Sequence, residues 1–295
     1  MTRRVLWRFF PLGLAIAVFV LSVAGAADWP TSLAAATNGA VFVTVAGDDG
    51  RPIAGLTAAD FAVRVAGHDL AVVSAEPAAD PVSLIVFVQV MPNDVSLTRA
   101  ALRSLLDSVR RASPHARIGL AFGSGDPEML AVTAQAQQLD RLVGTLYQEP
   151  DLGPLVERLP GLAAVLSKEP SRRRIILSIT PPGVTNGLRV GPETGASLQA
   201  AGSELWGIEV APVGSTVLDR DTIFEDLISR SGGRRATVYG AALLDTVVRQ
   251  AAELFLSQYL VTYTHPDAKG PLPLRVGVRG LRQGAQIFAP GWTID

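Results

Sequence analysis

Leu84-Ile85-Val86-Phe87-Val88 is a continuous apolar run, and the chain leaves it through Gln89-Val90-Met91-Pro92-Asn93. The amphipathic segment Asp94 to Arg111 follows directly. A buried strand, a short loop and a covering helix form the first unit of an α/β sheet. Because ligands of such sheets bind at the carboxyl ends of the central strands, the loop after Val88 is the first candidate for a functional site.

Apolar strands and helix-period segments alternate from Pro81 onwards, which predicts a doubly wound α/β sheet. The predicted strands are Val82 to Val88, Arg117 to Phe122, Met129 to Thr133, Arg174 to Ile179, Glu204 to Ala211 and Ala236 to Tyr239. The predicted helices are Val95 to Ala112, Ala136 to Leu146, Leu152 to Ser167, Glu193 to Gly202, Thr222 to Ser231 and Ala242 to Phe255.

Strand patterns flank this α/β region on both sides. Those before it are Ala40 to Val45, Phe61 to Val65 and Leu70 to Val73, with a single helical turn between Thr57 and Asp60, and those after it are Tyr259 to Thr264, Leu274 to Val278 and Gln286 to Ala289. A three-strand tail cannot bury a face alone, so we expect it to pair with the first group in a small β-sandwich-like unit. The alternative is that the alternating segments Val41 to Val45 and Tyr259 to Tyr263 are edges that accept a partner strand. Pairing within the chain is favoured because open edges invite aggregation.

The predicted division of the chain is a signal peptide (1–26), a linker (27–38), the first part of the β unit (39–79), the α/β domain (80–257) and the second part of the β unit (258–295). Arg3, Arg4 and Arg8 precede the uncharged run Phe9 to Val23, and Ala24-Gly25-Ala26 supplies a cleavage site. We therefore expect export to the periplasm or beyond, with membrane association only if the leader stays uncleaved as an anchor. The paired arginines leave open whether the general or the twin-arginine route is used.

Composition narrows the classes of function. The chain has 295 residues, 48% of them apolar and 18% charged, a formal net charge of −1 and no cysteine. Scattered basic residues and a charge near zero argue against nucleic acid as a partner. The absence of cysteine excludes disulfides, thiolate metal sites and a lipoprotein anchor. The run Arg172-Arg173-Arg174 is interpreted as a solvated turn before a strand.

The order of several motifs resembles bacterial secreted proteins with a von Willebrand factor type A-related domain. The motifs are the leader, the segment Gly55-Leu56-Thr57-Ala58-Ala59-Asp60-Phe61, the strand Pro81-Val82-Ser83-Leu84-Ile85-Val86 and the segment Ser257-Gln258-Tyr259-Leu260-Val261-Thr262-Tyr263. The likeness covers Asn38 to Ile294. It implies a Rossmann-like sheet and a role in binding proteins.

The resemblance also implies a metal site that this sequence does not reproduce. In that family an Asp-x-Ser-x-Ser loop after the first central strand, with a threonine and an aspartate from later loops, holds Mg²⁺ or a similar ion. Here the three loop positions fall on Gln89, Met91 and Asn93. Such cations prefer carboxylate, hydroxyl and water oxygens, so a thioether and neutral amides are poor substitutes. We therefore expect no metal and no cofactor.

The later loops are degenerate in the same way. Thr180-Pro181-Pro182-Gly183 stands where the aspartate would be, and the segment from Asp151 to Pro154 has no threonine. Asp94 and Asp151 are the nearest carboxylates that could replace the missing ligands, although Asp94 is better explained as a helix cap. We expect the binding surface at these loops, formed by Gln89, Met91, Pro92, Asn93, Asp94, Asp151, Thr180, Pro181 and Pro182, with Val184 beside them.

Two functions from different classes remain at this stage. The favoured one is an exported, non-enzymatic interaction or scaffold protein, with a protein as its partner and no catalytic residues. The alternative is a hydrolase-like enzyme on a doubly wound sheet that uses Ser124 or the pair Asp126 and Glu128. The three histidines, His68, His115 and His265, lie in separate predicted turns without metal-ligand spacing, so each is expected to be a solvated loop residue.

Overall fold

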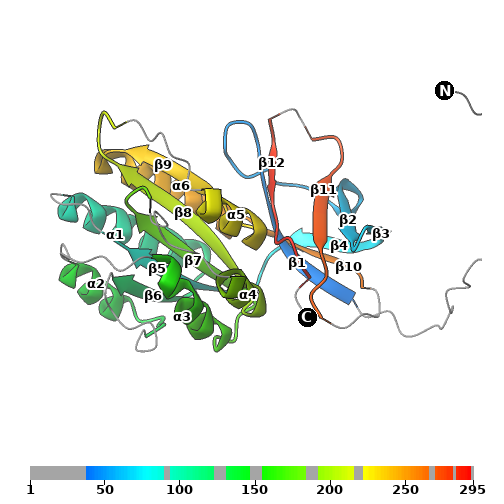
Figure 1. Ribbon diagram of the computed structural model, residues 1–295, viewed down its shortest axis with the longest axis horizontal. Coiled ribbons are helices and arrows are strands. Elements are labelled where there is room, and N and C mark those ends of the chain that lie inside the picture. The colour runs from blue at the N-terminus through cyan, green and yellow to red at the C-terminus, as the bar shows by residue number, and fades with distance from the viewer. Residues whose placement is uncertain are drawn as a thin grey trace, which may run out of the picture. The chain divides into compact units, whose positions relative to one another are not determined.

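The computed structural model describes residues 38–89, 94–122, 131–146, 155–183, 192–215, 222–265, 270–281 and 284–293. Ala36–Asp295 form one compact unit (Figure 1). The predicted signal peptide and linker lie outside the described residues, apart from Asn38, which begins a strand. No helix among the described residues has the length and apolarity needed to cross a membrane.

A five-stranded parallel sheet forms the α/β part. Its strand order is β6 (Arg117–Phe122), β5 (Val82–Val88), β7 (Arg173–Thr180), β8 (Ser203–Ala211) and β9 (Arg235–Tyr239), and every neighbouring pair is parallel. All seven residues of β5 are buried, as expected for a central strand covered on both faces. The α/β prediction is confirmed.

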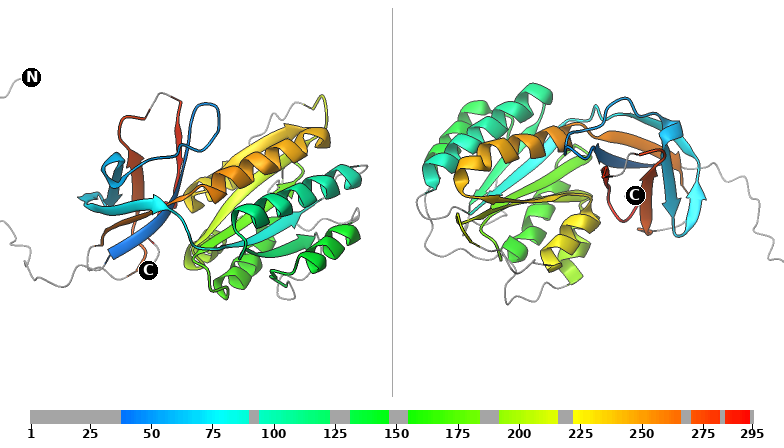
Figure 2. Two further views of the ribbon diagram at one scale, coloured as in Figure 1. Left: turned by 180° about the vertical axis from the view of Figure 1, so that it is seen from behind. Right: turned by 90° about the horizontal axis from the view of Figure 1, so that it is seen from above.

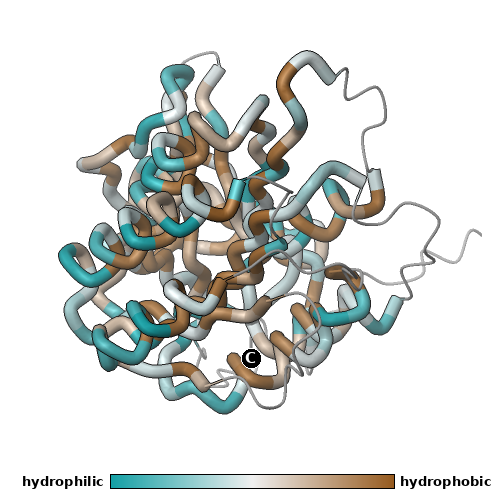
Figure 3. The backbone as a smooth tube through the Cα atoms, turned by 90° about the vertical axis from the view of Figure 1, so that its left-hand side faces the viewer, coloured by the Kyte–Doolittle hydropathy of each residue, from teal (hydrophilic) through white to brown (hydrophobic). Residues whose placement is uncertain are grey.

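Six helices cover the two faces of this sheet, as the view from above in Figure 2 shows. One face packs against α1 (Val95–Ala112), α2 (Ala136–Thr145) and α6 (Leu244–Leu256), and the other packs against α3 (Leu155–Ser167), α4 (Pro192–Ala200) and α5 (Thr222–Ser231). A short 3-10 turn, η3 (Ala241–Leu243), precedes α6. Hydrophobic and hydrophilic residues alternate along the helical coils in Figure 3, because one face of a covering helix packs on the sheet and the other faces solvent.

The prediction of a sixth strand at Met129 to Thr133 is wrong for residues 131–133, the part of it that the structure describes. Residues 123–130 lie outside the described residues, and Thr133 makes only an isolated antiparallel bridge to Ile118 of β6. Both backbone hydrogen bonds of that bridge are present, at 2.8 and 2.9 Å. This single bridge pairs one residue of the edge strand β6, but it does not add a further strand to the sheet.

Two antiparallel sheets form the β part. One has the order β12 (Gln286–Phe288), β1 (Asn38–Ala46), β10 (Tyr259–Thr264), β4 (Val72–Pro77), and the other has the order β11 (Leu274–Val278), β2 (Phe61–Val65), β3 (His68–Leu70). Val41 pairs with Val261, so both alternating segments are paired within the chain. Their inward side chains share one apolar core with β2 and β11. The expected pairing between the two ends of the chain is confirmed.

The predicted strand Leu70 to Val73 is divided in the structure. Leu70 ends β3 in one sheet, and Val72 begins β4 in the other. Ala66 (φ 48°) and Gly67 (φ 87°) both have left-handed backbone conformations, which suit the tight turn that joins β2 to β3. The expected helical turn is present as η1 (Ala58–Asp60), where the Thr57 N–H donates to Asp60 Oδ2 at 2.7 Å.

Candidate functional site

The carboxyl edge of the parallel sheet carries a row of polar side chains on one face. Gln89 follows β5, Thr180 ends β7, and Glu209 lies near the end of β8, in register with Thr180. The Gln89 N–H donates to Ile179 O at 2.8 Å, which extends the register of β5 and β7 to this level. By strand alternation all three side chains belong to the face that carries Ile85, Ile176 and Leu205, beside helices α3 to α5.

The structure describes five of the nine predicted surface residues. Gln89 is 6% exposed and Thr180 is fully buried, whereas Asp94, Pro181 and Pro182 are half-buried. Met91, Pro92, Asn93 and Asp151 lie outside the described residues, and so do Val184 and the alternative catalytic residues Ser124, Asp126 and Glu128. The described part of the surface therefore has a half-buried rim, formed by Asp94, Pro181 and Pro182, and a buried polar floor, formed by Gln89 and Thr180.

The expected cap by Asp94 is not formed by its side chain. Asp94 occupies the N-cap position of α1, but its carboxylate makes no capping hydrogen bond. Its backbone carbonyl instead accepts hydrogen bonds from the Thr98 N–H and from Thr98 Oγ1, both at 2.9 Å. The backbone conformation of Asp94 (φ −101°, ψ 6°) differs from the extended one that side-chain caps usually need.

Glu209 is a residue of this edge that the sequence analysis did not single out. Its side chain is fully buried, and Arg235 Nη2 of β9 donates to Glu209 Oε2 at 2.6 Å. The second carboxylate oxygen, Oε1, and the hydroxyl of neighbouring Thr180 are buried, and neither has a hydrogen-bond partner among the described residues. A glutamate inside the apolar strand segment from Leu205 to Ala211 is the signal that would have drawn attention to it.

The residues at this edge do not fit the divalent cation that the family resemblance implies. Gln89 and Thr180 supply neutral oxygens, and the charge of Glu209 is already balanced by Arg235. Within the described ranges, no group of three or more histidine, aspartate or glutamate side chains is arranged to hold a metal ion. A cation would gain little from the one buried carboxylate.

The three histidines lie away from the carboxyl edge. His68 begins β3 rather than lying in a turn, and His265 follows β10, so both belong to the β part. His115 precedes β6 at the amino end of the sheet, so the length of the strand, about 20 Å, separates it from the carboxyl end of β6. His68 and His115 are exposed, as expected, but His265 is half-buried with its ring 6.2 Å from that of Tyr263.

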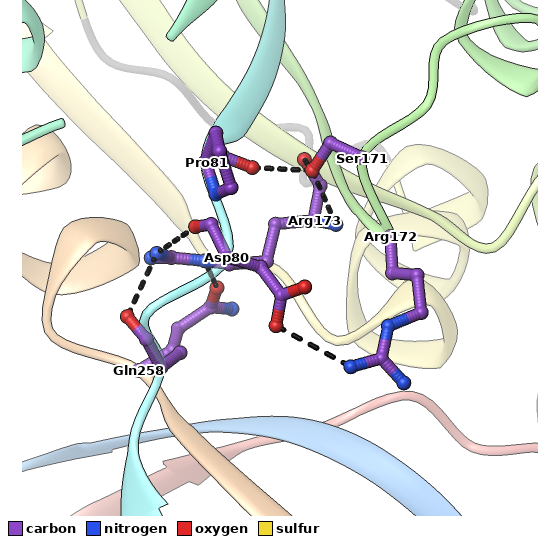
Figure 4. Close-up of polar contacts among 7 residues, drawn as sticks. Asp80, Pro81, Ser171, Arg172, Arg173 and Gln258 are labelled. Carbon is purple, nitrogen blue, oxygen red and sulfur yellow. Dashed lines mark hydrogen bonds and ion pairs between the residues drawn. The ribbon is translucent and has the colours of Figure 1, made fainter. Parts of the chain in front are cut away.

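A buried junction joins the β part to the amino end of the sheet, and Arg173 is its centre (Figure 4). Nη1 donates to Ala78 O at 3.2 Å and Asp80 O at 2.9 Å, in the connection from β4 to β5. Nη2 donates to Phe255 O at 2.8 Å and Leu256 O at 3.2 Å, at the carboxyl end of α6. One guanidinium therefore binds both segments through which the chain passes between its two parts.

The same junction contains a buried acid. Glu204 accepts hydrogen bonds from Gln258 Nε2 at 2.6 Å and from Trp206 Nε1 at 3.0 Å. Gln258 in turn accepts one from Arg173 Nε at 3.3 Å. Burial raises the pKa of Glu204 to about 7, although its two hydrogen bonds and the charge of Arg173 act in the opposite direction. Burial also lowers the pKa of Arg173.

The interpretation of Arg172-Arg173-Arg174 as a solvated turn is wrong for two of its members. β7 begins at Arg173, so strand alternation separates the three side chains. Arg173 is 4% exposed, and Arg174 is half-buried with Nη1 donating to Ala201 O at 2.9 Å. Arg172 alone is exposed, in a 3.4 Å ion pair with Asp80.

Comparisons with known proteins concern the fold alone. No protein-family model and no curated protein matches the chain. The chain is similar to the solved structure of a von Willebrand factor type A from Catenulispora acidiphila, with 10% identity, a TM-score of 0.46 and coverage of 88% of this chain and 74% of that one.

Two further solved structures are similar to the chain. One is the pilus adhesin SpaC from Lactobacillus rhamnosus GG in its open conformation, with 12% identity, a TM-score of 0.45 and coverage of 84% of this chain and 48% of that one. The other is the SpRpn10 VWA domain, with 11% identity, a TM-score of 0.43 and coverage of 59% of this chain and 96% of that one. The chain thus spans about half the length of the adhesin structure.

Proposed function

We propose that this chain is an exported, non-enzymatic protein-interaction or scaffold module that binds its partner at the carboxyl edge of the parallel sheet without a bridging divalent metal. The chemistry of that edge carries the proposal. Its described oxygens belong to an amide, a hydroxyl and a carboxylate that Arg235 neutralises. Such a set favours hydrogen bonding and shape over a metal bridge to a ligand carboxylate.

The rim supplies apolar contact at a low cost in entropy. Pro181 and Pro182 are half-buried and follow directly on the buried Thr180. Proline side chains lose little conformational freedom on binding, so they add contact area without a large ordering cost. A protein partner fits this surface better than a small polar substrate.

The positions of the histidines favour this function over the hydrolase alternative. A serine nucleophile needs a base within hydrogen-bonding reach. In the sequence Ser124 comes two residues after the end of β6, whereas His115 precedes the same strand and the other two histidines belong to the β part. The other enzyme alternative, which uses the pair Asp126 and Glu128, falls on residues that lie outside the described ranges.

Site-specific photo-crosslinking tests the proposed surface. A photoreactive amino acid is placed at Pro182 or at Asp94 on the rim, and at His115 on the opposite edge as the control, with the native leader retained. A discrete covalent adduct from the two rim positions but not from His115, unchanged by a chelator of divalent ions, is the expected result. Equal labelling from all three positions, or loss of the adduct with the chelator, would contradict the proposal.

The proposed export has its own test. The leader features at Arg3, Arg4 and Ala24 to Ala26 support cleavage after Ala26. Amino-terminal sequencing of protein recovered from the envelope fraction should begin at Ala27. Recovery of the chain from the cytoplasm with Met1 or Thr2 at its amino terminus would refute export.

A further inference from the structure

A cavity of about 740 Å³ opens between the two sheets of the β part, beside α5 and the start of β9. We call it the edge groove and define it by Arg275 and Val276 of β11, Ile287 and Phe288 of β12, Ile228 of α5, and Arg234. In Figure 1, β11 and β12 stand side by side, yet they belong to different sheets and each is the last strand of its sheet on this side. The groove is therefore walled by two strand edges.

The edge of β11 that faces away from β2 has unused backbone groups. The Leu274 N–H donates to Gly291 O at 2.9 Å, so the backbone of Leu274 points away from β2. Antiparallel alternation gives Val276 and Val278 the same direction. The odd-numbered residues point the other way, toward β2. Pro273 O accepts a hydrogen bond from the Ala66 N–H, and the Arg279 N–H donates one to Asp60 O. Among the described residues, no backbone bond reaches the outer edge of Val276 or Val278.

On the edge of β12, the backbone N–H and C=O of one residue, Ile287, also point away from the neighbouring strand. Val45 pairs with Ile287, and Val45 O accepts a 2.8 Å hydrogen bond from the Ile53 N–H on the far side of β1. The Val45 and Ile287 pair is therefore one whose backbone groups point away from each other. The N–H and C=O of Ile287 face the groove.

Four charged residues line the groove, and Glu225 and Arg235 among them pair with each other at 3.7 Å. The other two, Arg275 and Arg234, give the groove a net positive charge. Arg275 is exposed and makes no ion pair or side-chain hydrogen bond with any described residue. Arg275 is paired with Arg64 across β11 and β2, and Arg64 forms an ion pair with Asp69, with Nε 2.8 Å from Oδ1. Arg234 lies over the ring of Phe288, 5.9 Å from its centroid, with no carboxylate partner among the described residues. Like charges facing each other across strands are unfavourable, so an acid near Arg275 would stabilise this site.

We propose that the edge groove binds an extended peptide segment of a partner protein that carries an acidic side chain. The segment pairs with the part of the β11 edge that lies beyond the antiparallel bridge between Pro273 and Trp292, with hydrogen bonds to Val276 and Val278. Its carboxylate pairs with Arg275 or Arg234, and its apolar side chains contact Ile287 and Phe288. The groove volume lies within the range of ligand sites in general.

This second surface is independent of the carboxyl edge. It lies in the β part, whereas the surface proposed above lies at the loops after β5 and β7. One partner could use both surfaces, or two partners could be held together, as a scaffold requires. Variants of Pro181 and Pro182 should leave peptide binding in the groove unchanged, so the two proposals fail separately.

A designed peptide tests the groove directly. The probe is an acetylated and amidated hexapeptide of alternating valine and threonine with one glutamate, titrated into isotope-labelled protein of residues 27–295. We expect amide chemical-shift changes at Val276, Val278 and Ile287. A lysine in place of the glutamate should weaken binding about tenfold, because it replaces a charge-assisted pair by repulsion. Methylation of the peptide's backbone nitrogens on the side that pairs with β11 removes their N–H donors and should abolish binding.

A charge reversal supplies the matched protein control. Arg275→Glu should reverse the preference in favour of the lysine peptide, while Arg103→Glu on the exposed face of α1 makes the same change in net charge far from the groove and should leave the preference unaltered. Equal affinity for both peptides, no shift at β11, or unchanged binding of the methylated peptide would overturn the proposal. Shifts at β11 that depend on protein concentration alone would also overturn it, because a second copy would then be the occupant.

Discussion

Gln258 Nε2 donates a 2.6 Å hydrogen bond to Glu204 Oε1, which joins the connection after α6 to the amino end of β8. Both groups are buried, and Arg173 bonds to the same glutamine. The β part is thus held to the sheet by a polar cluster in which Arg173, Gln258 and Glu204 are linked in series by hydrogen bonds. This arrangement has consequences for stability that can be measured.

Glu204 should make the folded state less stable as the pH rises from about 4.5 to about 7. Its pKa is raised to about 7 in the folded protein, so in this interval the folded state holds a proton that the unfolded state has lost. The contribution is fully present below the unfolded pKa and is lost as the pH passes through the folded one. Glu204→Gln should remove up to about 3 kcal/mol of this pH dependence. Urea unfolding between pH 4 and 8 measures the difference, and parallel curves for the two proteins would refute the assignment.

Arg173→Ala should lower the free energy of unfolding by roughly 3–5 kcal/mol, because it leaves buried carbonyls and Glu204 without their donor or counter-charge. Arg172 provides a matched control one residue away, since it is exposed and pairs with Asp80 at 3.4 Å. Arg172→Ala should cost at most about 1 kcal/mol. Urea denaturation of both variants makes the comparison. Similar losses would mean that the cluster does not depend on Arg173.

Gly233 and Gly144 should respond oppositely to alanine. A Cβ on Gly233 would lie 1.8 Å from Leu205 O, and the backbone cannot move aside easily. Gly233→Ala should therefore cost more than about 3 kcal/mol or prevent folding. At Gly144, in α2, a Cβ would meet nothing within 4 Å. Gly144→Ala should add about 0.5–1 kcal/mol. Thermal melting of both variants decides this, and a stable Gly233→Ala protein would contradict the packing described.

Glu209→Ala should cost roughly 3–5 kcal/mol, because it leaves the guanidinium of Arg235 poorly compensated inside the protein. The control is Glu225→Ala, which removes the more distant partner of Arg235, at 3.7 Å and 48% exposed. That loss should be at most about 1 kcal/mol. Denaturant unfolding measures both. Equal losses would show that Glu209 does not neutralise Arg235 as described.

Periodicity predicted much of the fold because the covering helices and central strands are amphipathic or wholly apolar. Val82 to Val88 and Val95 to Ala112 have the predicted bounds in the structure. The division of Leu70 to Val73 between two sheets could not be predicted, since a change of sheet at Ala71 leaves the alternation of side chains unbroken.

The polar clusters were less accessible to sequence reasoning. Three consecutive arginines look alike in sequence, and only the start of β7 at Arg173 decides which one turns inward. Glu209 depends on Arg235, which comes from another strand 26 residues later. Such pairs are set by tertiary register and not by local pattern. Of the predicted surface, Gln89, Thr180, Pro181 and Pro182 lie together at the edge of the sheet because β5 and β7 are neighbours.

Titration of the protein of residues 27–295 with Mg²⁺, Mn²⁺ and Ca²⁺ in a calorimeter, paired with thermal melting in each ion, tests the central claim most directly. A metal-independent binding edge predicts no binding heat and no shift in melting temperature with any of the three ions. Micromolar binding that is lost in Asp94→Ala or Asp151→Ala would mean that a metal site is built from other ligands, and would contradict the account.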